Sequence, residues 1–449
     1  MKHYHFLAFC LAAISLGGCA KESNFPEATG KASVRAINSI ATSPTFNFLI
    51  EERSLGTVDY KIASGPASYD DLEYTFNFEV VLAGDQTLTR VASVLLDVEA
   101  NKDYTFIISG SIARPDITVW QGDAREWDGT ETVFESQFGH TAASSDPVDV
   151  YFAPDGVAPV YEERIGTLAF GEVLPVADFA EGEYVLTITT AGPAGEVLFA
   201  TNPILLPAQS SFLFSIFDAD ANDLGDLSAA LYNLSAGGSS ILVDSESNPT
   251  VRFFHASKDF GAIDIYIDDP LTTPFVADQM FGDVSAELTV TAGELPLTYT
   301  TAGSMGSILL DVDTSVPLGT RNHYYVVRTS EGADFLVESR PNRRSIETAG
   351  IFGIINTATS QPAVDAYLVP TGELIDDALP SIPVLQVAAD PSQVLVAAGS
   401  FDLYVTVTAE KTVLAGPISL DVGLGDVLDA IIYENVDPNV VDVVFVPVP

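Results

Sequence analysis

The sequence contains only two cysteines among its 449 residues. Cys10 and Cys19 both lie near the N-terminus, in a segment that we interpret below as a signal peptide and its cleavage site. Once Cys19 is modified as expected, no free thiol is left in the body of the chain. This excludes a disulfide framework, a thiolate metal site and a cysteine nucleophile from the folded part.

Positively charged residues are also scarce. The chain has 19 Lys and Arg against 62 Asp and Glu, which gives a formal net charge of −43. Such a surface repels the phosphate backbone, so nucleic acid is excluded as a partner. The acidic residues accompany 47% hydrophobic residues, a balance that favours folded domains over disorder. We interpret the acid as a solvated surface suited to salty surroundings, with cation binding as the alternative.

Common catalytic signatures are missing as well. The chain contains no Gly-rich phosphate loop, no G-x-S-x-G elbow and no H-E-x-x-H motif. Beyond the N-terminal segment, no apolar run reaches the roughly 18 residues that a membrane-spanning helix needs. We therefore predict a protein that is not an enzyme, with no catalytic residues and no required cofactor.

The N-terminus carries Lys2, an apolar run over residues 6–16, and then Gly17, Gly18 and Cys19. The run is too short to span a bilayer and is typical of a signal peptide. The sequence Leu-Gly-Gly-Cys resembles the lipobox of bacterial lipoproteins. This resemblance implies cleavage before Cys19 and lipidation of that residue. Ala20, where Asp would favour inner-membrane retention, points by the same resemblance to the outer membrane. The alternative is an ordinary secretory signal cut elsewhere near Cys19.

Four stretches of the chain are versions of one another. They begin at Ile37, Gly139, Phe254 and Ile355. The repeat is about 100 residues long, which exceeds a solenoid unit of roughly 20–50 residues and suits a small domain. We expect a signal peptide at 1–18, a flexible tether at 19–31, and domains at 32–130, 131–248, 249–345 and 346–449.

The periodic segments predict strands. They are rich in Val, Ile, Thr, Tyr and Phe, they alternate apolar with polar residues, and Gly, Pro, Asn and Asp interrupt them. The third copy gives about seven such segments, the number typical of an immunoglobulin-type sandwich. The sequence therefore predicts an all-β protein of four tandem immunoglobulin-like β-sandwich domains after a lipoprotein signal peptide.

The third copy also carries a family resemblance. Its opening, VRFFHASKDFGAIDIYID, resembles the bacterial family catalogued as domain of unknown function 4397. The matching positions are Arg252, His255, Ala256, Ser257, Asp264 and Tyr266. The resemblance implies secreted or surface-attached tandem modules without an established catalytic mechanism.

Two polar positions recur in all four copies, and the residue type at each position differs between the copies. His140 and His255 align with Asn38 and Asn356 in the other two copies. An amide replaces a hydrogen-bonding side chain but not a base or a metal ligand, so we predict that these residues hold a neighbouring backbone group. Asp149, Asp264 and Asp365 align with Asn47. We predict packing or loop tethering for them, with ligand binding at the sandwich end as the alternative.

The acidic loop at residues 218–226 is the best candidate for a cation site. Its oxygen-bearing side chains are Asp218, Asp220, Asn222, Asp223 and Asp226. The first three have the i, i+2, i+4 spacing of a calcium loop. However, Asp223 replaces the turn glycine of an EF-hand, and position twelve is Ala229. An acidic hairpin turn without metal is the alternative.

Two further features differ between the copies. Trp120 and Trp127 are the only tryptophans, and we expect a last strand packing on its neighbour, with a sugar-stacking platform as the alternative. RPNRR, the basic segment at residues 340–344, is the one basic cluster. We interpret it as a hinge held against acidic neighbouring domains, with a protease-sensitive linker as the alternative.

These observations lead to one functional hypothesis and one alternative. The first is a non-enzymatic outer-membrane protein, attached to the membrane through its N-terminal lipid and shaped as a rod. It would be a scaffold or an adhesion and binding module for polysaccharide or another envelope protein. The alternative is a calcium-assisted carbohydrate-binding or glycan-processing accessory protein. A specific site is expected where the copies differ, at residues 120–127, 218–226 or 340–344.

Overall fold

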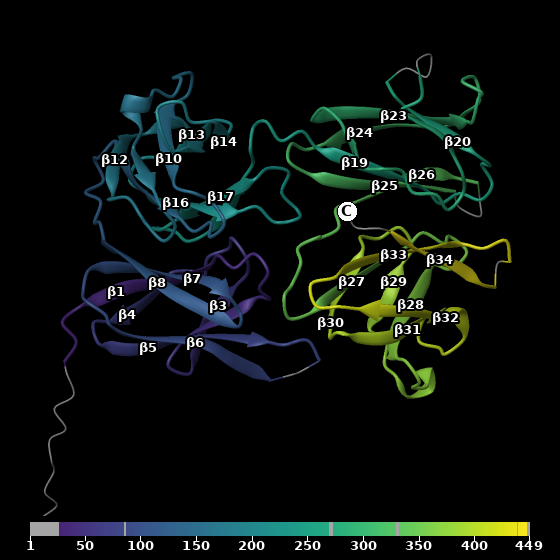
Figure 1. Cartoon of the computed structure of the whole chain (residues 1–449), viewed down its shortest axis with the longest axis horizontal. Coiled ribbons are helices and arrows are strands. Elements are labelled where there is room, and N and C mark those ends of the chain that lie inside the picture. The colour runs from purple at the N-terminus through teal and green to yellow at the C-terminus, as the bar shows by residue number, and fades with distance from the viewer. Residues whose placement is uncertain (1–26, 85–86, 269–272, 329–331, 438, 447–449) are drawn as a thin grey trace, which may run out of the picture.

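The computed structural model describes residues 27–84, 87–268, 273–328, 332–437 and 439–446. Within these ranges the chain forms four β-sandwiches arranged two by two (Figure 1). The expected signal peptide at 1–18, Cys19 and most of the expected tether lie outside the described residues. In the described ranges, no helix is long and apolar enough to cross a membrane.

The first sandwich has two four-stranded sheets, with strand orders β4-β1-β7-β8 and β3-β2-β5-β6. Its strands are β1 (Lys31–Asn38), β2 (Phe46–Ile50), β3 (Arg53–Val58), β4 (Ala67–Asp70), β5 (Glu73–Val81), β6 (Leu88–Asp97), β7 (Lys102–Ser111) and β8 (Arg114–Asp123). The first strand, β1, pairs antiparallel with β4 and parallel with β7.

The second sandwich has two five-stranded sheets. One has the order β12-β9-β16-β17-β18, and in the other β11-β10-β13-β14 is joined by β15 on β13. Its elements are β9 (Val133–His140), β10 (Val148–Pro154), the 3₁₀ turn η1 (Tyr161–Glu163), β11 (Gly166–Leu168), β12 (Ala177–Ala180), β13 (Gly182–Thr190), β14 (Val197–Ala200), β15 (Ile204–Leu206), β16 (Ser211–Asp218), β17 (Leu227–Asn233) and β18 (Ser239–Leu242).

The third and fourth sandwiches repeat the strand orders of the first. The third contains β19 (Thr250–His255), β20 (Ile263–Ile267), β21 (Val276–Gln279), β22 (Leu288–Thr289), β23 (Gly293–Thr301), β24 (Ile308–Val316), β25 (Arg321–Arg328) and β26 (Asp334–Ser339). The fourth contains β27 (Gly350–Asn356), β28 (Ala363–Pro370), the 3₁₀ turn η2 (Ile375–Asp377), β29 (Ile382–Gln386), β30 (Ser392–Val396), β31 (Gly399–Val407), β32 (Val413–Val422), β33 (Val427–Glu434) and β34 (Val441–Val446).

The predicted all-β fold of sandwich domains is confirmed. The third sandwich has eight strands in its described part where the sequence predicted about seven, because β21 is a short edge strand that lacks a clear apolar alternation. The first strand of each sandwich pairs in parallel with a strand near the end of the same sandwich, namely β1 with β7, β9 with β16, β19 with β25 and β27 with β33. In immunoglobulin constant domains the first strand lies beside the second, so the sandwich architecture is shared while the strand order differs.

Each sandwich buries one face of both sheets in its own core. In β10, Val148, Val150 and Phe152 point into the core of the second sandwich, as period-two alternation requires. The core of the first sandwich is aromatic, and the rings of Phe76 and Phe106 lie 4.3 Å apart between centroids. Apolar burial of this kind contributes about 25 cal/mol per Å².

Four sheets are buried on both faces because the sandwiches pack in pairs. The first and second sandwiches bury Ile37, Ile107 and Trp120 against residues of β16 and β17. The third and fourth bury residues of β19 and β25 against Ile355 and Ile431. The same sheet of each repeat faces the partner, so the molecule consists of two similar pairs of sandwiches.

The expected rod is not what the chain forms. Figure 1 shows the second pair of sandwiches beside the first rather than beyond it. Ile346 and Ala349 of the segment before β27, with Ile351, pack against Ala83 of the first sandwich and Val427 of the fourth. The second pair is held beside the first by this small apolar cluster and by polar contacts such as those of Asn222 with Asn342 and of Arg344 with Asp59.

Candidate functional site

A polar side chain closes the first strand in every sandwich and accepts a hydrogen bond from the backbone two residues on. The bonds run from the N–H of Ile40 to Asn38 Oδ1 (2.9 Å), of Ala142 to His140 Nδ1 (3.2 Å), of Ser257 to His255 Nδ1 (3.2 Å) and of Ala358 to Asn356 Oδ1 (3.0 Å). All four side chains are buried, and burial lowers the pKa of His140 and His255. The predicted structural role is therefore confirmed.

The aligned aspartates tie down the loop between the fifth and sixth strands of the repeat. Their Oδ2 atoms accept hydrogen bonds from the N–H groups of Gly192 (to Asp149, 2.7 Å), Gly303 (to Asp264, 2.8 Å) and Ala409 (to Asp365, 2.9 Å). The Oδ1 atoms of Asp264 and Asp365 accept further bonds from the N–H groups of Asp278 and Val384. The predicted loop-tethering role is confirmed.

The acidic loop at residues 218–226 connects β16 to β17 and contacts the first sandwich. Lys61, only 3% exposed, reaches across with its ammonium to the carboxylates of Asp220 and Asp223. The carboxylate of Asp218 accepts hydrogen bonds from the backbone of Ala143 and from Ser144. The loop is thus an interdomain contact between the first and second sandwiches.

Most of the candidate calcium ligands of this loop are engaged with other groups of the protein. Among the described residues, no group of three or more His, Cys, Asp or Glu side chains is placed to hold a metal ion. The buried ammonium of Lys61 neutralises Asp220 and Asp223. Asn222 is bonded to Asn342 and to the N–H of Arg343, and Asp226 is exposed to solvent.

The basic segment at residues 340–344 lies against acidic and carbonyl groups of its neighbours. Arg343, 3% exposed, forms an ion pair with Glu287 (3.2 Å). Arg344 donates to the backbone carbonyl oxygens of Ala41 (3.1 Å) and Ser43 (2.6 Å) and to the Asp59 carboxylate. Its interpretation as a segment held against neighbouring domains is confirmed. Gln393 of the fourth sandwich donates to the carbonyl oxygen of Asn342. The acidic loop and this segment therefore contact all four sandwiches, and we call residues 218–226 and 340–344 with their partners the junction.

The junction contains a buried charged cluster around His323. Burial, reinforced by the charges of Arg343 and Arg252, lowers the pKa of His323 to about 3. Arg343 Nη2 lies 2.9 Å from His323 Nε2, a geometry in which the neutral imidazole accepts. Burial raises the pKa of Glu287, but hydrogen bonds from Thr250 and Arg321 and the charge of Arg343 outweigh burial and bring it to about 2.

We expect His323 to make the junction less stable as the pH falls below neutral. The unfolded chain takes up a proton at its histidines near pH 6.5, whereas folded His323 stays neutral until about pH 3. Acidification from pH 7 to 5 therefore favours unfolding, by up to about 1.4 kcal/mol per pH unit below pH 6.5. Glu287 stays ionised over this range.

His323→Gln tests this expectation because glutamine keeps an acceptor for Arg343 and removes the titration. The measurement is the urea midpoint of unfolding at pH 7 and pH 5 for both proteins. The variant should lose less stability on acidification than the wild type. Equal losses in the two proteins would show that His323 does not titrate on unfolding as expected.

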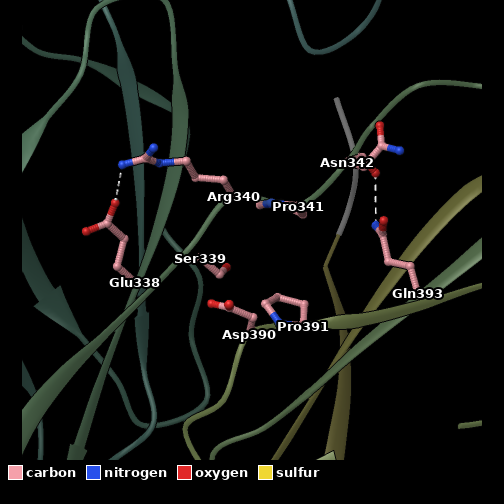
Figure 2. Close-up of a pocket in the computed structure, with 8 residues that line it drawn as sticks. All are labelled: Glu338, Ser339, Arg340, Pro341, Asn342, Asp390, Pro391 and Gln393. Carbon is pink, nitrogen blue, oxygen red and sulfur yellow. Dashed lines mark hydrogen bonds and ion pairs between the residues drawn. The ribbon is translucent and has the colours of Figure 1, made fainter. Parts of the chain in front are cut away.

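A polar cavity of about 600 Å³ lies beside the junction. Figure 2 shows it between the end of β26 with the following segment and the stretch that leads into β30. Its lining residues are Glu338, Ser339, Arg340, Pro341, Asn342, Asp390, Pro391 and Gln393. A second cavity of about 330 Å³ shares Arg340, Pro341 and Asn342 as a wall. The basic segment thus separates two hollows.

The tryptophans lie in the first pair. Trp120 is 5% exposed and packs between the first two sandwiches, where its Nε1 donates to the carbonyl oxygen of Gly171 (3.1 Å). This confirms the predicted packing of a last strand on its neighbour. Trp127 lies in the segment between the sandwiches, with the Arg125 guanidinium 4.0 Å from its ring centroid.

Sequence reasoning missed several residues of the junction. No motif marks Lys61, Glu287 or His323. Contacts at the junction join residues that are distant in the chain, such as Asn222 and Asn342. Asp390 and Gln393 of the cavity were missed for the same reason. One sequence signal did indicate that the sandwiches pack on one another. In strands such as β16 (SFLFSIFD), apolar residues do not alternate with polar ones. Such runs are typical of sheets covered on both faces.

Comparison with solved structures finds the Bacillus anthracis TIE protein at 9% sequence identity and a TM-score of 0.15. The match covers 86% of this chain and 65% of that chain, and a likeness this weak carries no argument. Comparison with curated proteins gives no match.

Comparison with protein families matches residues 32–151 and 249–367. Each match begins at the first strand of an odd-numbered sandwich and ends within the second strand of the next, β10 or β28. The matches therefore follow the two pairs of sandwiches seen in the structure. They cover more than half of the sequence, and the chain belongs to the family described as Domain of unknown function (DUF4397).

Proposed function

We propose that this chain is a non-enzymatic, lipid-anchored protein of the outer membrane that works as a multidomain scaffold or adhesion and binding module. The observation that carries the proposal is the junction, where Lys61, Asn222 and Arg344 tie the sandwiches to one another. A block locked in this way presents surfaces in fixed relative positions, which reduces the entropic cost of binding a large partner.

The roles of the repeated polar residues support the non-enzymatic part. A general base must reach the substrate proton within hydrogen-bond distance. His140 and His255 are fully buried, and both accept bonds from their own backbone. Asp149, Asp264 and Asp365 are likewise engaged with loop amides. These side chains are used to shape the sandwiches.

The membrane anchor is tested by Cys19→Ala. The LGGC sequence that ends at Cys19 motivates the proposal, and several acyl chains hold a protein stably where one chain binds marginally. We expect wild-type protein in the outer-membrane fraction and the variant in the soluble fraction. Cys10→Ala is the matched control and should stay with the membrane. Membrane fractionation of Cys19→Ala like the wild type would contradict the anchor.

Carbohydrate binding is the second candidate function, and the polar cavity beside residues 340–342 favours it. We propose that this binding needs no calcium, a proposal supported by the ion pairs of Lys61 with Asp220 and Asp223. Binding assays in the presence of a chelator are expected to match those with added calcium.

A further inference from the structure

The cavity beside the junction occurs in the second pair of sandwiches, at a place that the first pair fills with side chains. In the first pair, Arg125 of the segment before β9 bonds to Asp178 of β12 and to Glu131. Trp127 stacks on the same guanidinium. In the second pair, the strand that corresponds to β12 is β30, and the cavity lies between it and the segment at Arg340 and Pro341.

We propose that this cavity binds a neutral, hydroxyl-rich ligand, namely a short segment of a neutral polysaccharide. The inference rests on the proposed binding role and gives that role a site and a ligand class. The volume of about 600 Å³ is within the range of ligand pockets, roughly 300–1,000 Å³.

The lining supplies the hydrogen-bonding groups that a sugar needs. Each hydroxyl both donates and accepts, so a sugar site needs donors and acceptors side by side. The carboxylates of Glu338 and Asp390 accept, the guanidinium of Arg340 and the amide nitrogen of Asn342 donate, and the amide of Gln393 can do both. Pro341 and Pro391 add flat apolar surface, against which the C–H faces of a sugar ring can pack.

The charge of the cavity selects against anionic ligands. Arg340 pairs with Glu338 at 2.8 Å, so the carboxylate of Asp390 leaves the lining negative. The whole chain carries −43, and its field repels acidic polysaccharides. The paired guanidinium also opposes a bare cation. A neutral polyhydroxylated chain avoids both penalties.

Three of the polar groups, on Arg340, Asn342 and Gln393, are held in place before any ligand arrives. Arg340 Nε donates to Asn322 Oδ1 (3.0 Å), and Gln393 Nε2 donates to the carbonyl oxygen of Asn342 (2.9 Å), as Figure 2 shows for the second bond. The side chain of Asn342 accepts from Asn222 across the junction. Groups held this way lose little freedom on binding, which favours affinity.

The test is calorimetric titration of the full chain, extracted in detergent, with neutral oligosaccharides of glucose, xylose, mannose and galactose. An oligogalacturonate serves as the acidic probe. We expect at least one neutral series to bind and the acidic probe not to bind. Asp390→Ala and Gln393→Ala should each weaken binding about tenfold, as expected for a hydrogen bond that involves a charged or buried group.

Asp376→Ala is the matched control. It also removes an exposed aspartate from the fourth sandwich, but from η2, which does not line the cavity. It should bind like the wild type. The inference is overturned if none of the neutral series binds, if the oligogalacturonate binds as well, or if Asp390→Ala binds like Asp376→Ala. The Cys19→Ala fractionation is independent of these titrations, so failure of the sugar site and failure of the anchored-module proposal can be told apart.

Discussion

Gly139→Ala is expected to loosen the contact between the first and second sandwiches. A Cβ at this position would lie 2.2, 2.5 and 2.9 Å from three ring carbons of Trp120. These separations are far below a van der Waals contact, so the ring or the β9 backbone must move. Because Trp120 is buried and bonded to Gly171, we expect a cost of about 1–3 kcal/mol, as for other overpacked sites.

Two measurements check this result. Tryptophan fluorescence should shift to the red as Trp120 meets water, with Trp127→Phe as the background that isolates its signal. Small-angle scattering should show a larger radius of gyration if the first pair opens. Gly65→Ala is the control, since a Cβ there meets no atom within 4 Å. Unchanged fluorescence in Gly139→Ala would mean that the first pair does not depend on this close approach.

The strands and the roles of the repeated residues could be predicted from the sequence because both depend on local pattern. Alternation in β10 places Val148 and Val150 in the core whatever surrounds the domain. The exchange of His255 for Asn356 between copies already reveals a hydrogen-bonding role, because both side chains offer an acceptor to the amide two residues on.

The arrangement of the sandwiches could not be predicted in the same way. Ile37 and Phe254 occupy outer faces of their sheets, where they pack on the neighbouring sandwich. In the sequence they look like core residues of their own domain, and nothing in the repeat distinguishes the two kinds of burial. The sequence therefore suggested a rod where the structure has two pairs side by side.

The predicted calcium loop shows a second limit. The spacing of Asp218, Asp220 and Asn222 resembles that of a calcium loop, but spacing does not reveal which partners the side chains meet. Asp218 bonds to Ala143 and Ser144, Asn222 bonds to Asn342, and Asp220 faces the ammonium of Lys61. Lys61 is distant in the sequence from Asp223, and it reaches the loop only because the first two sandwiches pack face to face. The sequence segments where the copies differ, residues 218–226 and 340–344, do meet at the junction. Their side chains make structural contacts there.

Asp264→Ala is expected to cause the largest local loss of stability. The carboxylate is 4% exposed and accepts from the N–H groups of Asp278 (2.9 Å) and Gly303 (2.8 Å). Its removal leaves both amides without this partner in a site that excludes water. Hydrogen bonds to charged groups contribute about 1.5–3 kcal/mol each, so we expect a loss on the order of 3 kcal/mol in the third sandwich.

Hydrogen exchange is the suitable measurement, because four packed sandwiches need not unfold in a single step. The amides of Asp278 and Gly303 should lose protection in Asp264→Ala, and the thermal transition should move to lower temperature. Asp264→Asn should lie between the two proteins, since Asn47 serves at the aligned position of the first sandwich. Asp313→Ala is the control, because it removes an aspartate side chain from an exposed position on β24. It should change the free energy of unfolding by less than about 0.5 kcal/mol. If Asp264→Ala behaves like Asp313→Ala, the aspartate does not tether the loop.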